Sequence, residues 1–201
     1  MHIPDNYLSP LTCICFAGVS AIFLKIASTK VKNELGKKQI SSIAVYSAFS
    51  FIIMMFNIPL PGGTSGHAVG AALTSIILGP WASVISTSIA LIIQAVFFGD
   101  GGILSLGANI FNMAIVMPFS AYYIFYILSK VIKNRKITVF LSGYFSINIA
   151  ALITAIEFGI QPILFKTAEG FPMYSPYSFH VSIPAMLIPH LLVAGFAEGI
   201  F

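Results

Sequence analysis

Short polar breaks divide the sequence into apolar runs of the length that crosses a membrane as a helix. About 20 apolar residues span the hydrocarbon core of a bilayer. Charged residues make up 8% of the 201-residue chain, against about 25% in soluble domains. We therefore expect an all-α integral membrane protein with about seven transmembrane helices in a single domain, residues 1–201. The expected spans are residues 11–29, 40–56, 65–79, 81–98, 103–128, 137–164 and 179–201.

Two basic loops predict which way the chain crosses the membrane. Residues 30–38 and 130–136 hold eight of the ten Lys and Arg residues, and seven spans place both loops on one side. Because cytoplasmic loops carry the excess of Lys and Arg, the amino terminus is expected outside. No basic stretch precedes the first apolar run, as a signal peptide would require, so we expect the terminus to remain in the mature protein. The last run is still apolar at Phe201, which leaves open whether the last helix is truncated.

The first two residues, Met1 and His2, form a pattern that can chelate a metal ion. The terminal amine, the His2 backbone nitrogen and the His2 ring can close two small rings on one metal and leave a fourth corner open. His67 opens the third expected span from the same outer side and could supply the fourth nitrogen. Four nitrogens in one plane suit Ni(II) or Cu(II). Metal binding is expected to expel protons from the amine, the His2 amide and the rings, so affinity should fall in acid.

Simpler explanations exist for the ionisable residues of this chain. A histidine at position 2 is most often an exposed terminal residue, and its agreement in side with His67 is what favours a metal site. Ionisable groups inside membrane spans usually face the bundle interior. We attribute most of them to interhelical hydrogen bonds. Of these, His190 and Glu198 fall toward the cytoplasmic end and are not expected to bind metal. The residues of this kind are Glu157, Glu198, His180 and His190.

Several short motifs follow one another in a set order along nearly the whole chain. They are Met1–Asp5, Leu8–Pro10, Gly62–His67, Phe98–Gly102, Leu106–Asn109 with Asn112–Met113, Glu157–Pro162, Ile183–Met186 and His190–Leu191. In this order they resemble the CbiM/NikM family, the substrate-binding components of energy-coupling-factor (ECF) transporters for cobalt and nickel. The resemblance implies a six-helix core with one added amino-terminal helix, in a multi-pass protein of the prokaryotic plasma membrane.

The resemblance also implies which residues bind the transported ion. The family's metal ligands correspond to the Met1 amine, the backbone and ring nitrogens of His2, and the ring of His67. Residues 1–10 would form a plug in a cavity of the helical bundle, residues 11–201. Candidates for contacts around the ligands or the plug are Asp5, Ser65 and Asn109.

Partners are implied by what the sequence lacks. It contains no Gly-x-x-x-x-Gly-Lys-Ser/Thr phosphate loop, so separate ATPase subunits would have to power transport through a transmembrane coupling subunit. Ala44 and Ala48 resemble the Ala-xxx-Ala step that docks this coupling subunit in relatives. A small accessory membrane subunit is a further expected partner. We expect Ni(II), ahead of Co(II), as the transported ligand, with no organic cofactor, no nucleic acid and no enzymatic activity.

An alternative from another functional class rests on Ser65. Residues 63–66, Gly-Thr-Ser-Gly, fit the Gly-x-Ser-Gly pattern of rhomboid-type intramembrane serine proteases. Ser65 would then be the nucleophile, with His180 or His190 as the base. Helix starts favour Ser and Gly in any case, and this alternative gives Met1, His2 and His67 no role.

Overall fold

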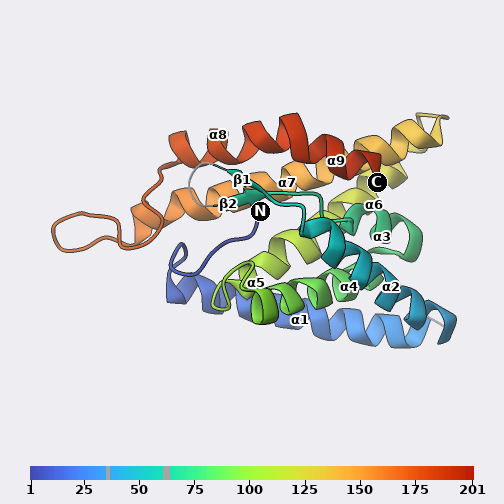
Figure 1. The fold of residues 1–201 in the computed structure, drawn as a ribbon, viewed down its shortest axis with the longest axis horizontal. Helices are drawn as coiled ribbons and strands as arrows, with labels where there is room; N and C mark the ends of the chain where they lie inside the picture. The colour runs from blue at the N-terminus through green and yellow to red at the C-terminus, as the bar shows by residue number, and fades with distance from the viewer. Residues whose placement is uncertain (35–36, 61–63) are drawn as a thin grey trace.

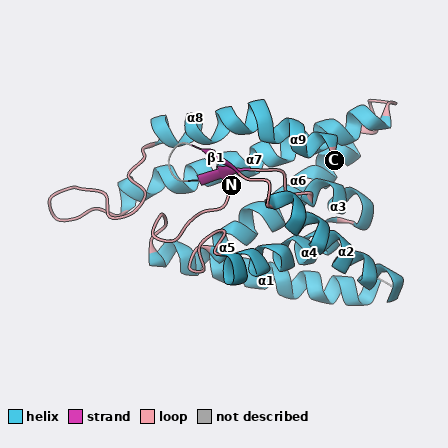
Figure 2. Cartoon of the chain, in the orientation of Figure 1, coloured by secondary structure: helices cyan, strands magenta, loops and turns pink. Residues whose placement is uncertain are grey.

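Helices form most of the computed structural model, which describes residues 1–34, 37–60 and 64–201 (Figures 1 and 2). The π-helical segments η1, η2 and η3 continue the α-helices beside them. Two short strands, β1 (Ile58–Leu60) and β2 (Thr64–Gly66), pair antiparallel between α2 and α3. The helical elements are α1 (Pro10–Glu34), α2 (Lys37–Met54), α3 (Ala71–Leu78), α4 (Pro80–Ile93), η1 (Gln94–Phe98), α5 (Leu106–Asn109), η2 (Ile110–Val116), α6 (Met117–Leu128), α7 (Arg135–Leu164), α8 (Phe179–Pro189), η3 (His190–Ala194) and α9 (Gly195–Ile200).

The helical spans confirm the predicted all-α, multi-pass architecture. Among the described residues, five helices are long and apolar enough to cross a membrane, and a shorter apolar helix covers residues 40–54. The fourth to seventh predicted spans agree with the observed ends to within three residues. The five observed spans are residues 10–33, 80–98, 106–128, 135–164 and 179–200.

The third predicted span, residues 65–79, is helical only in its second half. Residues 64–66 form β2, and α3 begins at Ala71. Gly70 explains the late start, because its φ of 74° is left-handed and a Cβ there would lie 2.8 Å from Cε1 of Phe49. Extended chain advances about 3.3 Å per residue against 1.5 Å in a helix, so the stretch before Gly70 carries His67 far into the bundle. Gly62 and Gly63 of the same motif, like residues 35–36, lie outside the described residues.

Helix α1 runs along one edge of the bundle (blue in Figure 1). Only 17% of its most apolar stretch is buried, so most of its surface is left for lipid. Its contact with the bundle is close at Gly107 of α5, where a Cβ would lie 2.5 Å from the Ala17 backbone. There Ser20 donates a hydrogen bond of 2.7 Å to the Gly107 carbonyl. A glycine therefore sets how closely α1 can approach.

Helix α7 lies against the rod formed by α8, η3 and α9, which runs along the opposite edge from α1 (Figure 1). Glycines again permit the approach. A Cβ on Gly143 of α7 would lie 2.8 Å from the Glu198 carbonyl oxygen, and one on Gly199 would lie 2.8 Å from Phe140. The position of α9 is thus fixed closely by α7.

Between these two edges lies the amino terminus. Met1 is 1% exposed and Ile3 is fully buried, and the end of the chain lies in the middle of the bundle in Figure 1. The segment before α1 therefore fills the interior rather than extending into solvent.

The α1 contact makes a testable prediction about stability. Gly107→Ala should push α1 away from α5 and lower the free energy of unfolding by about 1–3 kcal/mol, the usual cost of overpacking. The matched control is Gly18→Ala. Gly18 lies on α1 itself, with no atom within 4 Å of the added Cβ, so this substitution should not destabilise the protein. Thermal melting of both variants in detergent is the measurement. Equal melting temperatures for the two variants would contradict the prediction.

Candidate metal centre

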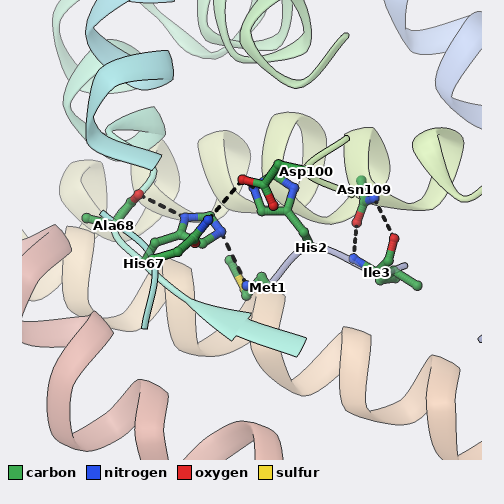
Figure 3. Close-up of polar contacts among 8 residues, drawn as sticks. Met1, His2, Ile3, His67, Ala68, Asp100 and Asn109 are labelled. Carbon is green, nitrogen blue, oxygen red and sulfur yellow. Dashed lines mark hydrogen bonds and ion pairs between the residues drawn. The ribbon is translucent and has the colours of Figure 1, made fainter. Parts of the chain in front are cut away.

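The amino-terminal segment is held in the bundle through the main chain of Ile3 (Figure 3). The Ile3 N–H donates to Oδ1 of Asn109 at 2.8 Å, and Nδ2 of Asn109 donates back to the Ile3 carbonyl at 3.1 Å. The same carbonyl accepts from the Ser105 hydroxyl at 2.6 Å and from the Gly102 N–H at 2.9 Å. All the polar groups of this buried residue are satisfied, as a low-dielectric interior requires.

Asp5 fixes the segment to the start of α5. Its carboxylate accepts hydrogen bonds from three consecutive main-chain N–H groups, those of residues 103–105, at 3.2, 2.9 and 3.3 Å. Gly102 lies so close to Asp5 that a Cβ at position 102 would collide with the carboxylate. The turn at residues 99–105 and the amino-terminal segment therefore fix each other's position.

The far end of the plug is fixed to α7. The Ser9 N–H donates to Oε1 of Gln161 at 2.9 Å, and the Ser9 hydroxyl caps the start of α1 by accepting from the Thr12 N–H at 3.1 Å. Ile3, Asp5 and Ser9 thus each tie residues 1–9 to the bundle.

His67 meets the amino terminus itself. Its ring is 3% exposed, and its Nε2 lies 3.3 Å from the Met1 amine nitrogen. The other ring nitrogen, Nδ1, lies 3.0 Å from the Ala68 carbonyl oxygen and can only be the donor in that contact. This fixes the tautomer, so the Nε2 lone pair points to Met1, as in metal-binding histidines whose second nitrogen is held by a carbonyl.

The His2 ring stacks against the His67 ring, with centroids 4.6 Å apart and planes 29° apart. Its Nε2 faces Oδ2 of Asp100 at 3.7 Å, longer than a direct hydrogen bond. The same Asp100 oxygen accepts from Nδ2 of Asn57 at 2.9 Å. On the other side of the ring, a Cβ on Gly101 would lie 3.1 Å from Nδ1. Position 101 has a φ of 85°, so it favours glycine both for space and for backbone conformation.

Burial favours the neutral form of the Met1 amine and of both histidine rings. Desolvation lowers the pKa of the Met1 amine from 8.0 to about 4, against a smaller opposing effect of the Asp100 charge. Burial, helped by the charge of the amine, lowers the pKa of His2 to about 3. The pKa of His67 falls well below its usual value, first by burial and then by the charges of the amine and His2. Nitrogen binds a metal through its lone pair, which a bound proton would occupy.

An apolar cavity of about 380 Å³ lies beside His67. It lies between α2, the β1–β2 pair and the rod formed by α8, η3 and α9. Among the described residues that line it, His67 has the one polar side chain. The low polarity on this side disfavours any charge on the His67 ring.

The structure brings the Met1 amine close to His67 Nε2 and stacks the His2 ring on the His67 ring. In the part of the chain that the structure describes, no group of three or more His, Cys, Asp or Glu side chains is arranged to hold a metal. Together with the His2 amide, the amine and the two rings offer four nitrogen donors, a set that suits square-planar Ni(II) or Cu(II).

The structure places the other predicted site residues as follows. Asp5, within the plug, accepts from the main chain at the start of α5, and Asn109 of α5 bonds to Ile3 of the plug. Ser65 lies in β2, two residues before His67, and its side chain is outside what is described. Ala44 and Ala48 are exposed on α2, four residues apart.

Two residues make contacts that the sequence did not indicate. Asp100 was recognised only as part of a turn motif, although its carboxylate faces His2. Glu198 was expected to form interhelical hydrogen bonds and not to bind metal, and its carboxylate does bond to main-chain N–H groups at the start of α3. That these groups lie just after His67 was not predicted, because residues 65–79 were expected to form one helix. A buried carboxylate in an apolar segment was the available signal.

Known proteins are similar to this chain over its whole length. Over its full length the chain is 46% identical to a protein of Lactiplantibacillus plantarum described as a probable fused nickel transport protein, LarMN. It is 45% identical to the fused nickel transport protein NikMN of Rhodobacter capsulatus. The chain spans 62% and 59% of the length of these two curated relatives. Both are described as transport proteins, not enzymes, which gives the protease alternative no support.

A solved structure and a family match complete the comparison. The whole chain superposes with a TM-score of 0.97 on 94% of a crystal structure described as a truncated transition metal transporter, at 51% identity. Residues 2–201 match the family CbiM, described as the cobalt uptake substrate-specific transmembrane region. The chain therefore belongs to the CbiM family of membrane proteins.

Proposed function

We propose that this chain is the ion-capturing membrane component of an importer for divalent transition-metal ions, with Ni(II) favoured over Co(II). The observation that carries the proposal is the buried Met1 amine, 3.3 Å from Nε2 of His67 and beside the stacked His2 ring. The proposed ligands are the Met1 amine, the amide and ring nitrogens of His2, and His67 Nε2. The ion enters from the outer side, where the Asp100 turn lies over His2.

The preference for nickel rests on ligand chemistry and on the relatives. Four planar nitrogens favour Ni(II) over Co(II), while Cu(II) would bind more tightly still, so selectivity against copper depends on its scarcity. Two relatives are described as nickel transport proteins, whereas the family description names cobalt. Nickel is therefore the proposed ion and cobalt its nearest competitor.

Inward release needs partners. The chain carries no phosphate-binding loop for ATP, so the proposal includes separate ATPase subunits and a transmembrane coupling subunit of the ECF type. The exposed Ala44 and Ala48 of α2 form a flat small-residue step on which a partner helix could pack closely. A small accessory membrane subunit belongs to the same proposal.

Removing the His67 ring tests the ligand set. His67→Ala deletes one of four donors, and we expect the Ni(II) affinity to fall by more than the roughly 10–100-fold that loss of an outer partner costs. Competition with a metallochromic chelator in detergent measures it. His180→Ala, a substitution of an exposed histidine on α8, is the matched control and should leave the affinity unchanged. Binding within a few-fold of the parent in His67→Ala would exclude His67 as a ligand.

An added residue tests the terminal amine. A glycine placed before Met1 converts the amine to an amide and lengthens a plug whose first residue is already buried. The extended chain could still bind nickel through a new frame of one amine, two amides and the His2 ring. We therefore expect weaker binding that no longer responds to His67→Ala, measured by the same competition in both backgrounds. Unchanged affinity that still depends on His67 would rule out the amine.

Burial also predicts how many protons binding releases. A base with a lowered pKa takes up a proton only when the pH falls to that pKa, so above about pH 5 the amine and the His2 ring are already neutral, and the lowered pKa of His67 favours a neutral ring in the same way. This revises the expectation that all of them lose protons. Near pH 7 the His2 amide should be the source of about one proton per Ni(II).

Calorimetry in two buffers of different ionisation enthalpy counts these protons. Between about pH 5 and 8 the affinity should rise by about tenfold per pH unit, the slope for one released proton. A short Met-His peptide is the control, because its solvated amine has an ordinary pKa near 8 and adds a second proton. Release of two or more protons by the protein near pH 7 would contradict the prediction.

A further inference from the structure

Glu198 of α9 binds the main chain immediately after His67. Its side chain is 3% exposed. Oε2 accepts hydrogen bonds from the N–H groups of Val69 at 2.6 Å and Gly70 at 2.9 Å, and Oε1 accepts from the N–H of Ala72 at 3.2 Å. One carboxylate thus satisfies three buried main-chain donors from a segment more than 120 residues away in the sequence.

The local backbone is shaped for this contact. A left-handed residue can turn consecutive N–H groups to one side, where they form a cradle for an anionic oxygen. Gly70, with its φ of 74°, is that residue. It also lies against the Phe49 ring, which leaves no space for a side chain. The conformation of residues 69–72 and the Glu198 carboxylate therefore depend on each other.

Glu198 is itself held firmly. Gly143 of α7 contacts the Glu198 carbonyl, and Gly199 packs on Phe140, so the backbone of α9 cannot shift freely at this point. The carboxylate is a fixed point supplied by the last rod, and the cradle after His67 is attached to it.

His67 is connected to this fixed point through two peptide units. Its Nδ1 donates to the carbonyl of Ala68, and the next residue, Val69, makes the shortest bond to Glu198. The Ala68 carbonyl and the Val69 N–H belong to one peptide group, so rotation of that group would move the acceptor that holds the His67 ring. We propose that Glu198 is the positioning residue of the metal centre: it holds the 69–72 main chain so that His67 Nε2 faces the amino-terminal nitrogens. This inference rests on the proposed function and deepens it.

The test is a double-mutant cycle on the full chain in detergent, with Ni(II) affinity measured by chelator competition. Glu198→Gln keeps the side-chain volume but replaces one accepting oxygen with an NH2 group, which cannot accept from a main-chain N–H. We expect the affinity to fall about 10- to 100-fold. In the His67→Ala background the same substitution should change the residual affinity by less than about twofold, because Glu198 acts through His67.

A matched control separates positioning from loss of a buried carboxyl group. Glu157→Gln removes another buried carboxyl group in the bundle, one bonded to Asn112 at 2.8 Å and not to the His67 segment, and should leave the affinity within about twofold. Melting temperatures identify any variant that unfolds, and Glu198→Asp, with a shorter carboxylate, then replaces Glu198→Gln. The visible absorption band of the nickel complex should change in the Glu198 variant and not in Glu157→Gln.

The outcomes of these measurements separate the positioning role of Glu198 from the proposed function. An equal loss of affinity from Glu198→Gln with and without His67 would overturn the positioning role, as would an unchanged affinity in the parent background. If His67→Ala alone leaves binding intact, the proposed function fails, and the positioning role with it. If His67→Ala abolishes tight binding and Glu198→Gln does not weaken it, the positioning role alone fails.

Discussion

Both main-chain polar groups of Ile3 are bonded inside the bundle, and the geometry of the centre depends on this clamp. Extended chain cannot satisfy its own N–H and C=O groups, and leaving them unpaired in a membrane interior costs several kcal/mol each. Asn109 pairs with Ile3 through both ends of its amide, much as a neighbouring strand would. Once Ile3 is held, the two residues before it have little freedom, and the Met1 amine must lie near His67.

The same burial accounts for the chemistry of the centre. Removing water disfavours charge on the amine and on both rings, so the groups that could bind a cation are kept neutral and available. The polar contacts around these groups fix their orientation. The Ala68 carbonyl fixes the tautomer of His67, and Asp100, in the turn at residues 99–102, faces His2. Glu198 connects the main chain after His67 to α9. Position and protonation state thus have one cause, a terminal segment enclosed by helices.

Much of this could be predicted from the sequence because it depends on local composition. Helices such as 80–98 and 135–164 are continuous apolar runs with clear breaks, and the charge of the basic loops put His2 and His67 on one side. The β1–β2 pair and the extended stretch before Gly70 could not be predicted, because residues 65–79 are apolar enough to pass for a span. Because the extended stretch was not predicted, the contact between Glu198 and Val69 could not be predicted either. The Asp100 contact depends on how a turn folds back over the plug, which spacing alone does not give.

The buried amine also bears on how such a chain must be made. Any acyl group left on the Met1 nitrogen after translation would remove its basic lone pair and would have no room beside His67. The orientation expected from the basic loops places this end of the chain on the outer face, away from the cytoplasmic enzymes that trim new polypeptides. If the Met1 amine is a ligand, as proposed, such a group would have to be removed before the first residues cross the bilayer. The order of processing and membrane insertion would then be a condition for metal binding, set by one nitrogen atom.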